Sequence, residues 1–136
     1  MKILICCSKA FYEKIDFIKK ELEEKGHSII LPNSYDNVGR EQEMRELGRK
    51  EHADWKGQMF RESEEKIKET DALLVLNYEK NGKKNYLGGS TLLEMYDAFK
   101  LNKKIFMVNP VPENMLKDEI LGLNPIIIEN NLEMVK

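Results

Sequence analysis

A glycine pair followed by a carboxylate is the feature of this sequence best suited to chemistry. The segment reads Gly88-Gly89-Ser90-Thr91-Leu92-Leu93-Glu94. Glycines let a ligand approach the backbone closely, and the amides at a helix start favour an anion or a hydroxyl group. We expect the positive end of that helix to keep Glu94 ionised and to lower its pKa. An ionised carboxylate can attack an anomeric carbon or stabilise an oxocarbenium-like transition state.

The spacing of Thr91 and Glu94 also fits a capping box, which is the structural alternative. In a capping box Glu94 would accept a hydrogen bond from the first amide of its own helix. Such a side chain would be solvated and dispensable, whereas a nucleophile should face a pocket. Local spacing alone favours the cap, so the surroundings of Glu94 decide between the two.

Further polar residues follow the apolar runs that predict strands. Ser8 and Lys9 come directly after the first run, where they could contact a ligand, although Ser8 could equally cap the next helix. His52 and Asp54 do not face each other on a helix, so we expect a solvated surface pair. The predicted substrate-binding residues are Ser8, Lys9, Phe11, Asn77, Gly88, Gly89, Ser90 and Asn109.

The elements that must position these residues alternate along the chain. Strands are predicted at residues 3–7, 28–31, 71–76 and 104–108, with a weaker one at 125–128. Helices are predicted from Phe11 to Leu22, over 51–70, and over 91–101, where Leu92, Met95, Tyr96 and Phe99 form an apolar stripe. Alternation of this kind predicts an α/β fold with parallel strands and right-handed crossovers. The polar connection at 33–50 is predicted to be a lid or disordered, although residues 41–50 could be helical.

Length, charge and cysteine content indicate how many domains and which kinds of partner to expect. The chain has 136 residues, of which 34% are charged, and a net charge of -2. We expect a single domain, 1–136, with no nucleic-acid partner, because no basic excess is present. Cys6 and Cys7 are adjacent and lack the spacing of a zinc site, so we expect reduced thiols and no bound metal. The apolar stretch near the N-terminus is too short for export or a membrane span, which favours the cytoplasm.

Residues 71–110, DALLVLNYEKNGKKNYLGGSTLLEMYDAFKLNKKIFMVNP, resemble the nucleoside 2-deoxyribosyltransferase-like family, which includes 2-deoxynucleoside 5′-phosphate N-hydrolases. The resemblance extends over nearly the whole chain. It implies a flavodoxin-like doubly wound sheet of about five mainly parallel strands with helices on both faces. It also implies a homodimer or larger homo-oligomer, and cleavage of N-glycosidic bonds without a cofactor. The family nucleophile falls on Glu94.

The resemblance implies a retaining cleavage or base transfer on a nucleoside or nucleoside 5′-monophosphate. Glu62 or Glu64 would supply the second acid, and Ser8, Lys9 and Ser90 could hold a 5′-phosphate, which favours hydrolysis. Gly88 and Tyr96 depart from the family pattern. The alternative function is therefore a catalytically inactive nucleotide-binding or regulatory module on the same fold.

Overall fold

The computed structural model describes all residues, 1–136, and contains one sheet of five parallel strands. The strand order is β2-β1-β3-β4-β5, so the order reverses between β1 and β3. Cys7 pairs with Leu76 at the carboxyl ends of these two strands. The predicted doubly wound α/β fold is thereby confirmed. The strands are β1 (Lys2–Cys7), β2 (Ser28–Ile30), β3 (Ala72–Leu76), β4 (Lys104–Met107) and β5 (Ile126–Ile127).

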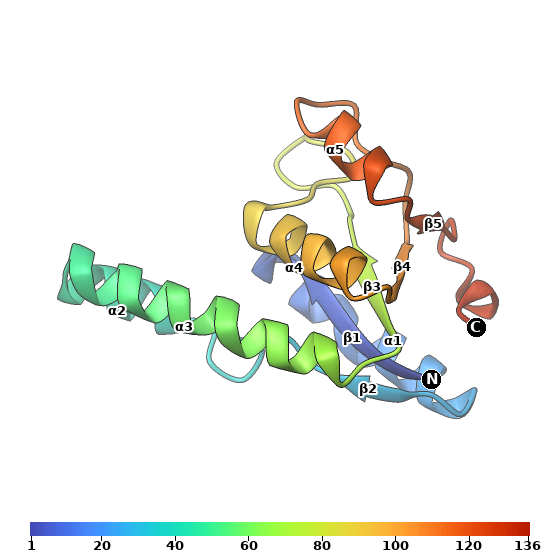
Figure 1. Cartoon of the computed structure of the whole chain (residues 1–136), viewed down its shortest axis with the longest axis horizontal. Helices are drawn as coiled ribbons and strands as arrows, with labels where there is room; N and C mark the ends of the chain where they lie inside the picture. The colour runs from blue at the N-terminus through green and yellow to red at the C-terminus, as the bar shows by residue number, and fades with distance from the viewer.

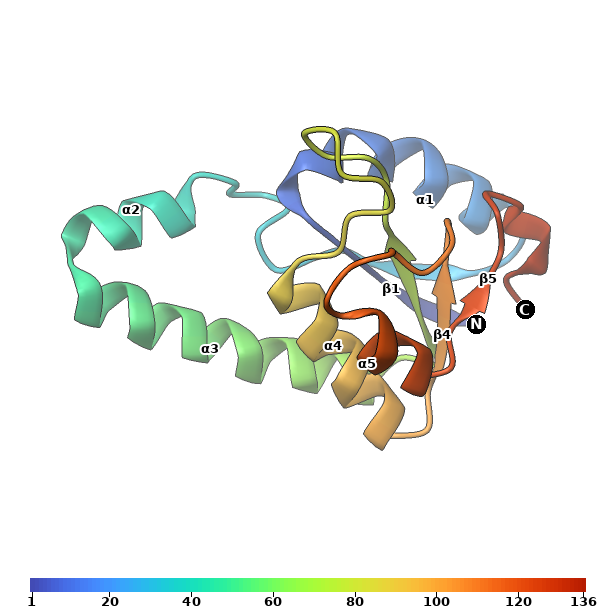
Figure 2. The ribbon, with the colours of Figure 1, turned by 90° about the horizontal axis from the view of Figure 1, so that it is seen from above.

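Helices cover both faces of the sheet (Figure 2). Successive residues of β1 and β3 point to opposite faces, so each strand feeds two separate apolar cores. Ile3, Ile5 and Leu74 pack with α1, whereas Leu4, Leu73 and Val75 pack with α4 and α5. The helices are η1 (Lys9–Lys14, 3-10), α1 (Ile15–Glu24), α2 (Arg40–Leu47), α3 (Arg49–Lys68), α4 (Gly89–Lys100), α5 (Lys117–Gly122) and η2 (Leu132–Met134, 3-10).

Two helix predictions needed correction. The helix predicted from Phe11 begins as a 3-10 turn, in which the Phe11 amide donates to the Ser8 carbonyl at 3.0 Å, and α-helix geometry starts only at Ile15. The connection predicted as a lid or disordered contains α2, which was foreseen only as an option. By contrast, α3 continues through Gly57 as a single helix.

Helices α2 and α3 form a hairpin that projects beyond the sheet (Figures 1 and 2). The chain reverses at Gly48, whose φ of 150° is a backbone conformation that residues with a side chain rarely adopt. The C-terminal half of α3 lies beside α4 (Figure 2). None of the helices combines the length and apolar character needed to cross a membrane.

Candidate active site

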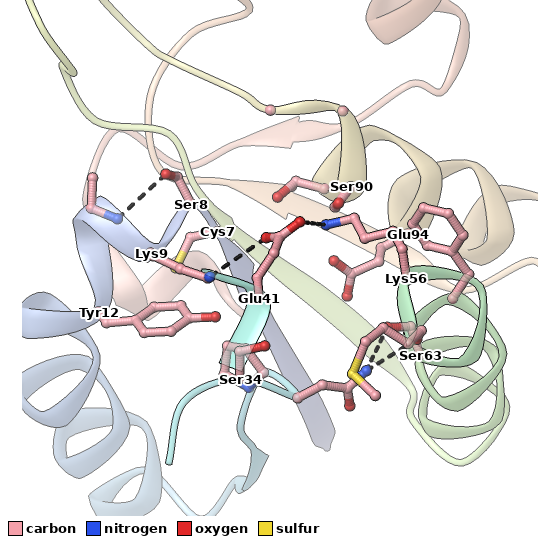
Figure 3. A pocket seen from close by; sticks show the side chains of 18 of the residues that line it. Cys7, Ser8, Lys9, Tyr12, Ser34, Glu41, Lys56, Ser63, Ser90 and Glu94 are labelled. Atoms are coloured by element: carbon pink, nitrogen blue, oxygen red, sulfur yellow. Dashed lines mark hydrogen bonds and ion pairs between the residues drawn. The ribbon is translucent and has the colours of Figure 1, made fainter. Parts of the chain in front are cut away.

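A pocket of about 520 Å³ opens at the carboxyl ends of β1 and β3, beside the start of α4. Ligands of open α/β sheets bind at this edge, where the strand order reverses. Residues from η1, α2, α3 and α4 contribute side chains to its wall (Figure 3). The pocket brings together six of the predicted site residues: Ser8, Lys9, Gly88, Gly89, Ser90 and Glu94.

Glu94 extends from α4 into the pocket and is held from the strand side. Its Oε2 accepts a hydrogen bond from Cys6 Sγ at 3.3 Å. Protein atoms surround most of the carboxylate, while part of the side chain stays open to the cavity. Burial raises the pKa of Glu94 to about 7, against the opposing effects of the Cys6 hydrogen bond and the Lys66 charge.

The expectation of a lowered pKa at Glu94 was therefore wrong. Helix α4 begins at Gly89, so Glu94 lies beyond the first turn, where the effect of the helix dipole has largely decayed. Desolvation of the carboxylate outweighs what remains of it. The expectation considered only local sequence and could not include this burial.

The capping alternative for Glu94 is also not what the structure contains. The N-cap position of α4 is Gly88, with no side-chain cap hydrogen bond, and Thr91 is a buried residue inside the helix. Cys6, rather than a backbone amide of α4, donates to the Glu94 carboxylate. Glu94 is therefore available to a ligand in the pocket.

Ser8 caps the helical segment that follows β1 and also lines the pocket. Its Oγ accepts from the Ala10 amide at 3.3 Å and from Lys80 Nζ at 3.2 Å, and its side chain also lines the pocket. Lys80 lies over the ring of Tyr86, 4.6 Å from its centroid. A Cβ added at Gly89 would meet no atom within 4 Å, so the protein leaves this approach to the α4 amides open.

Glu41 on α2 is the main site residue that sequence reasoning missed. Only 12% of its side chain is exposed, and its Oε2 lies 3.3 Å from Arg45, 3.0 Å from His52 and 3.1 Å from Lys56. Its Oε1 lies 3.5 Å from Lys9. Burial acts to raise the pKa of Glu41, but the bonds from His52 and Lys56 and the charge of Lys9 hold it at about 2.

The only sequence signal for this cluster was the i, i+4 spacing of Glu41 and Arg45, which is common on exposed helices. Its other contacts join separate elements, so no local pattern reports them. The expected surface pair of His52 with Asp54 was wrong: His52 binds Glu41, and Asp54 pairs with Lys50 at 2.6 Å.

Phe11, Asn77 and Asn109 lie outside the pocket lining. Phe11 is buried in the core and packs edge-on against Tyr78. The Asn77 side chain is fully buried, donating to the carbonyls of Asn109 and Pro110 and accepting from the Asn109 amide at 2.9 Å. These contacts hold the ends of β3 and β4 together, which is a structural role.

Glu62 and Glu64 do not join Glu94 in the main pocket. Glu62 is exposed and accepts from Gln58 at 3.2 Å. Glu64 lines a separate shallow hollow of about 250 Å³, which also borders Glu94 and Leu93. The proton-bearing groups that do face the pocket include Tyr12, whose pKa is raised by burial and by the nearby Cys7 and Glu94.

No group of three or more His, Cys, Asp or Glu side chains in the structure is arranged to hold a metal ion. The chain matches no protein-family model. Comparison with curated proteins gives no match either.

Proposed function

We propose that this protein cleaves N-glycosidic bonds of nucleosides or nucleoside 5′-monophosphates, with Glu94 as the nucleophile. The observation that carries the proposal is the position of Glu94. Its carboxylate faces a cavity of about 520 Å³ at the strand-order reversal, with no helix amide to cap. With a pKa of about 7, a substantial fraction is ionised at neutral pH and able to attack.

The reaction has two displacements at C1′ of the sugar. The ionised Glu94 attacks C1′ while the bond to the base breaks, and the base leaves with the bonding electrons and takes up a proton. Water then attacks C1′, loses a proton and releases Glu94, so configuration is retained. A second base in place of water would give transfer instead. No metal or redox cofactor enters either step.

The charge of the wall supports a phosphorylated substrate. Lys9, Arg45, Lys56 and Lys80 line the same cavity, against the carboxylates of Glu41 and Glu94. Ser8 and Ser90 add hydroxyl groups near the open start of α4, where a 5′-phosphate would be stabilised. Tyr12, Trp55 and Tyr86 offer aromatic surface for a base. Because Ser8, Lys9 and Ser90 could together hold a 5′-phosphate, we favour hydrolysis over transfer.

The second candidate is a nucleotide-binding or regulatory module without turnover. One observation favours it: neither Glu62 nor Glu64 lines the main pocket, and the other carboxyl group there, Glu41, has a pKa of about 2 and so carries no proton for the leaving base. In either case we place the protein in the cytoplasm, because Cys6 and Cys7 are both unpaired thiols.

Base release from a panel of nucleosides and 5′-monophosphates, followed by chromatography, tests the proposal. We expect release by the wild type and a loss of about a thousandfold or more in Glu94→Gln, as for other removed nucleophiles. Glu43→Gln is the matched control, because Glu43 is an exposed residue of α2 paired with Arg40. Undiminished release in Glu94→Gln would exclude Glu94. Tight nucleotide binding without any release would favour the binding module.

A further inference from the structure

One wall of the pocket carries more positive charge than its single carboxylate can balance. Glu41 is a single negative charge within 3.5 Å of Lys9, Arg45 and Lys56, and His52 donates to it as well. Three positive charges therefore meet one negative charge at the edge of a cavity open to solvent. Such an excess lowers the energy of any further anion that enters the cavity.

The two oxygens of Glu41 are held unequally. Oε2 has three partners on the hairpin, all within 3.3 Å. Oε1 faces only Lys9, at 3.5 Å, and the Lys9 side chain is 37% exposed. Lys9 belongs to η1, immediately after Ser8, so this ion pair reaches across the pocket from the hairpin to the body (Figure 3). Lys9 is thus the partner that Glu41 can lose most easily.

We propose that Glu41 is an internal counter-anion, which pairs with Lys9 at the pocket and is exchanged there for the anionic group of a ligand. The inference rests on the proposed function in one respect, because it places an anionic ligand in the pocket of Glu94. It adds that ligand binding competes with a carboxylate of the protein itself, and that Lys9 changes partner when the ligand binds.

A phosphate group is suited to this exchange. It carries up to two negative charges and three acceptor oxygens, against one charge on Glu41. Ser8 and Lys80, which hydrogen bond to each other at 3.2 Å, are adjacent donors that a phosphate could engage together with Lys9. Protonation does not release Glu41 near neutral pH, since its pKa is about 2, whereas a competing anion can. The exchange would also loosen the tie between the hairpin and η1.

Binding of inorganic phosphate, measured by calorimetry without any turnover, tests the exchange. We expect Glu41→Gln to bind phosphate about tenfold more tightly than the wild type, because the competitor is gone while its cationic partners remain. Glu43→Gln removes the same charge from the exposed side of α2 and should change the affinity by less than about twofold. Equal or weaker phosphate binding by a folded Glu41→Gln protein would overturn the proposal.

Glu41→Asp provides a second variant in case the glutamine protein does not fold. It keeps the charge but withdraws the carboxylate from Lys9 by one methylene group, so phosphate should still bind more tightly than to the wild type. No gain in Glu41→Asp would also overturn the exchange. Tighter phosphate binding without any base release would support the exchange and contradict the glycosidase. Base release from uncharged nucleosides, with no phosphate binding by any variant, would support the glycosidase and overturn the exchange.

Discussion

Glu94 illustrates how a single residue acquires its chemistry from its neighbours. The carboxylate is surrounded mainly by protein, and burial raises its pKa from the ordinary 4.5 to about 7. The nearest donor is a thiol, which is a weak hydrogen-bond donor and leaves the carboxylate basic. A carboxylate with these properties is poised between its neutral and ionised forms at neutral pH.

The raised pKa of Glu94 makes the stability of the protein depend on pH. Between pH 4.5 and 7 the folded chain binds this proton and the unfolded chain releases it, so stability falls as pH rises. The Glu94→Gln protein lacks this pH-dependent loss of stability, and we expect it to be about 3 kcal/mol more stable than the wild type at pH 8. At pH 5 the two should differ little. Urea unfolding at both pH values measures this, and a difference independent of pH would contradict the raised pKa.

The hydrogen bond from Cys6 should lower the pKa of Glu94. Burial raises the pKa of the Cys6 thiol, which therefore stays protonated and donates. Because this bond lowers the pKa of Glu94, Cys6→Ala should raise it above 7, and Cys6→Ser, which keeps a donor, should not. Carbon-13 NMR titration of the carboxyl group measures the shift. Cys7→Ala is the control, because Cys7 does not donate to Glu94; an equal shift there would argue against the Cys6 bond.

At the scale of the elements, the α2–α3 hairpin carries the wall of the pocket that sequence reasoning missed. Glu41 lies on α2, and its partners His52 and Lys56 lie on α3. The chain reverses between the two helices at Gly48. The hairpin therefore includes one backbone position that a residue with a side chain rarely adopts.

The two glycines of this region should respond to alanine in opposite ways. At Gly48 the φ of 150° is strained for alanine, so Gly48→Ala should cost about 1–2 kcal/mol. Gly57 lies inside α3, where a Cβ would meet nothing within 4 Å, so Gly57→Ala should stabilise by about 0.5–1 kcal/mol. Denaturant unfolding of both variants provides the comparison. Destabilisation by Gly57→Ala would mean that α3 is not a continuous helix in solution.

At the scale of the whole molecule, several large apolar side chains of α3 and α4 are exposed. The predicted apolar stripe of α4 is only partly buried: Met95 is in the core, whereas Tyr96 and Phe99 are 49% and 47% exposed. Leu93 and Phe60 are also exposed, and both border the shallow hollow of about 250 Å³ that Glu64 lines. Exposed apolar residues grouped in this way are typical of a protein–protein interface, and we expect a second copy of the chain to cover them.

We therefore predict a homodimer that buries this surface of α4. Sedimentation equilibrium should detect a dimer of the wild type and mostly monomer for the double variant Tyr96→Glu, Phe99→Glu, because two charges cannot be buried without partners. Phe17→Glu is the control, since Phe17 is exposed on α1, across the sheet. A monomeric wild type, or equal dissociation by Phe17→Glu, would contradict this arrangement.

The sequence by itself determined the alternation of strands and helices, because continuous apolar runs and helical stripes are local patterns. It also indicated Ser8, Lys9, Gly88, Gly89, Ser90 and Glu94, which follow strands or begin a helix at the edge where parallel strands end. Only the tertiary structure decided the surroundings of Glu94, the cluster on Glu41 and the core positions of Phe11 and Asn77. Desolvation and Coulomb energies depend on distances between residues far apart in the chain, such as Cys6 to Glu94 and Lys9 to Glu41, and no local spacing contains those distances.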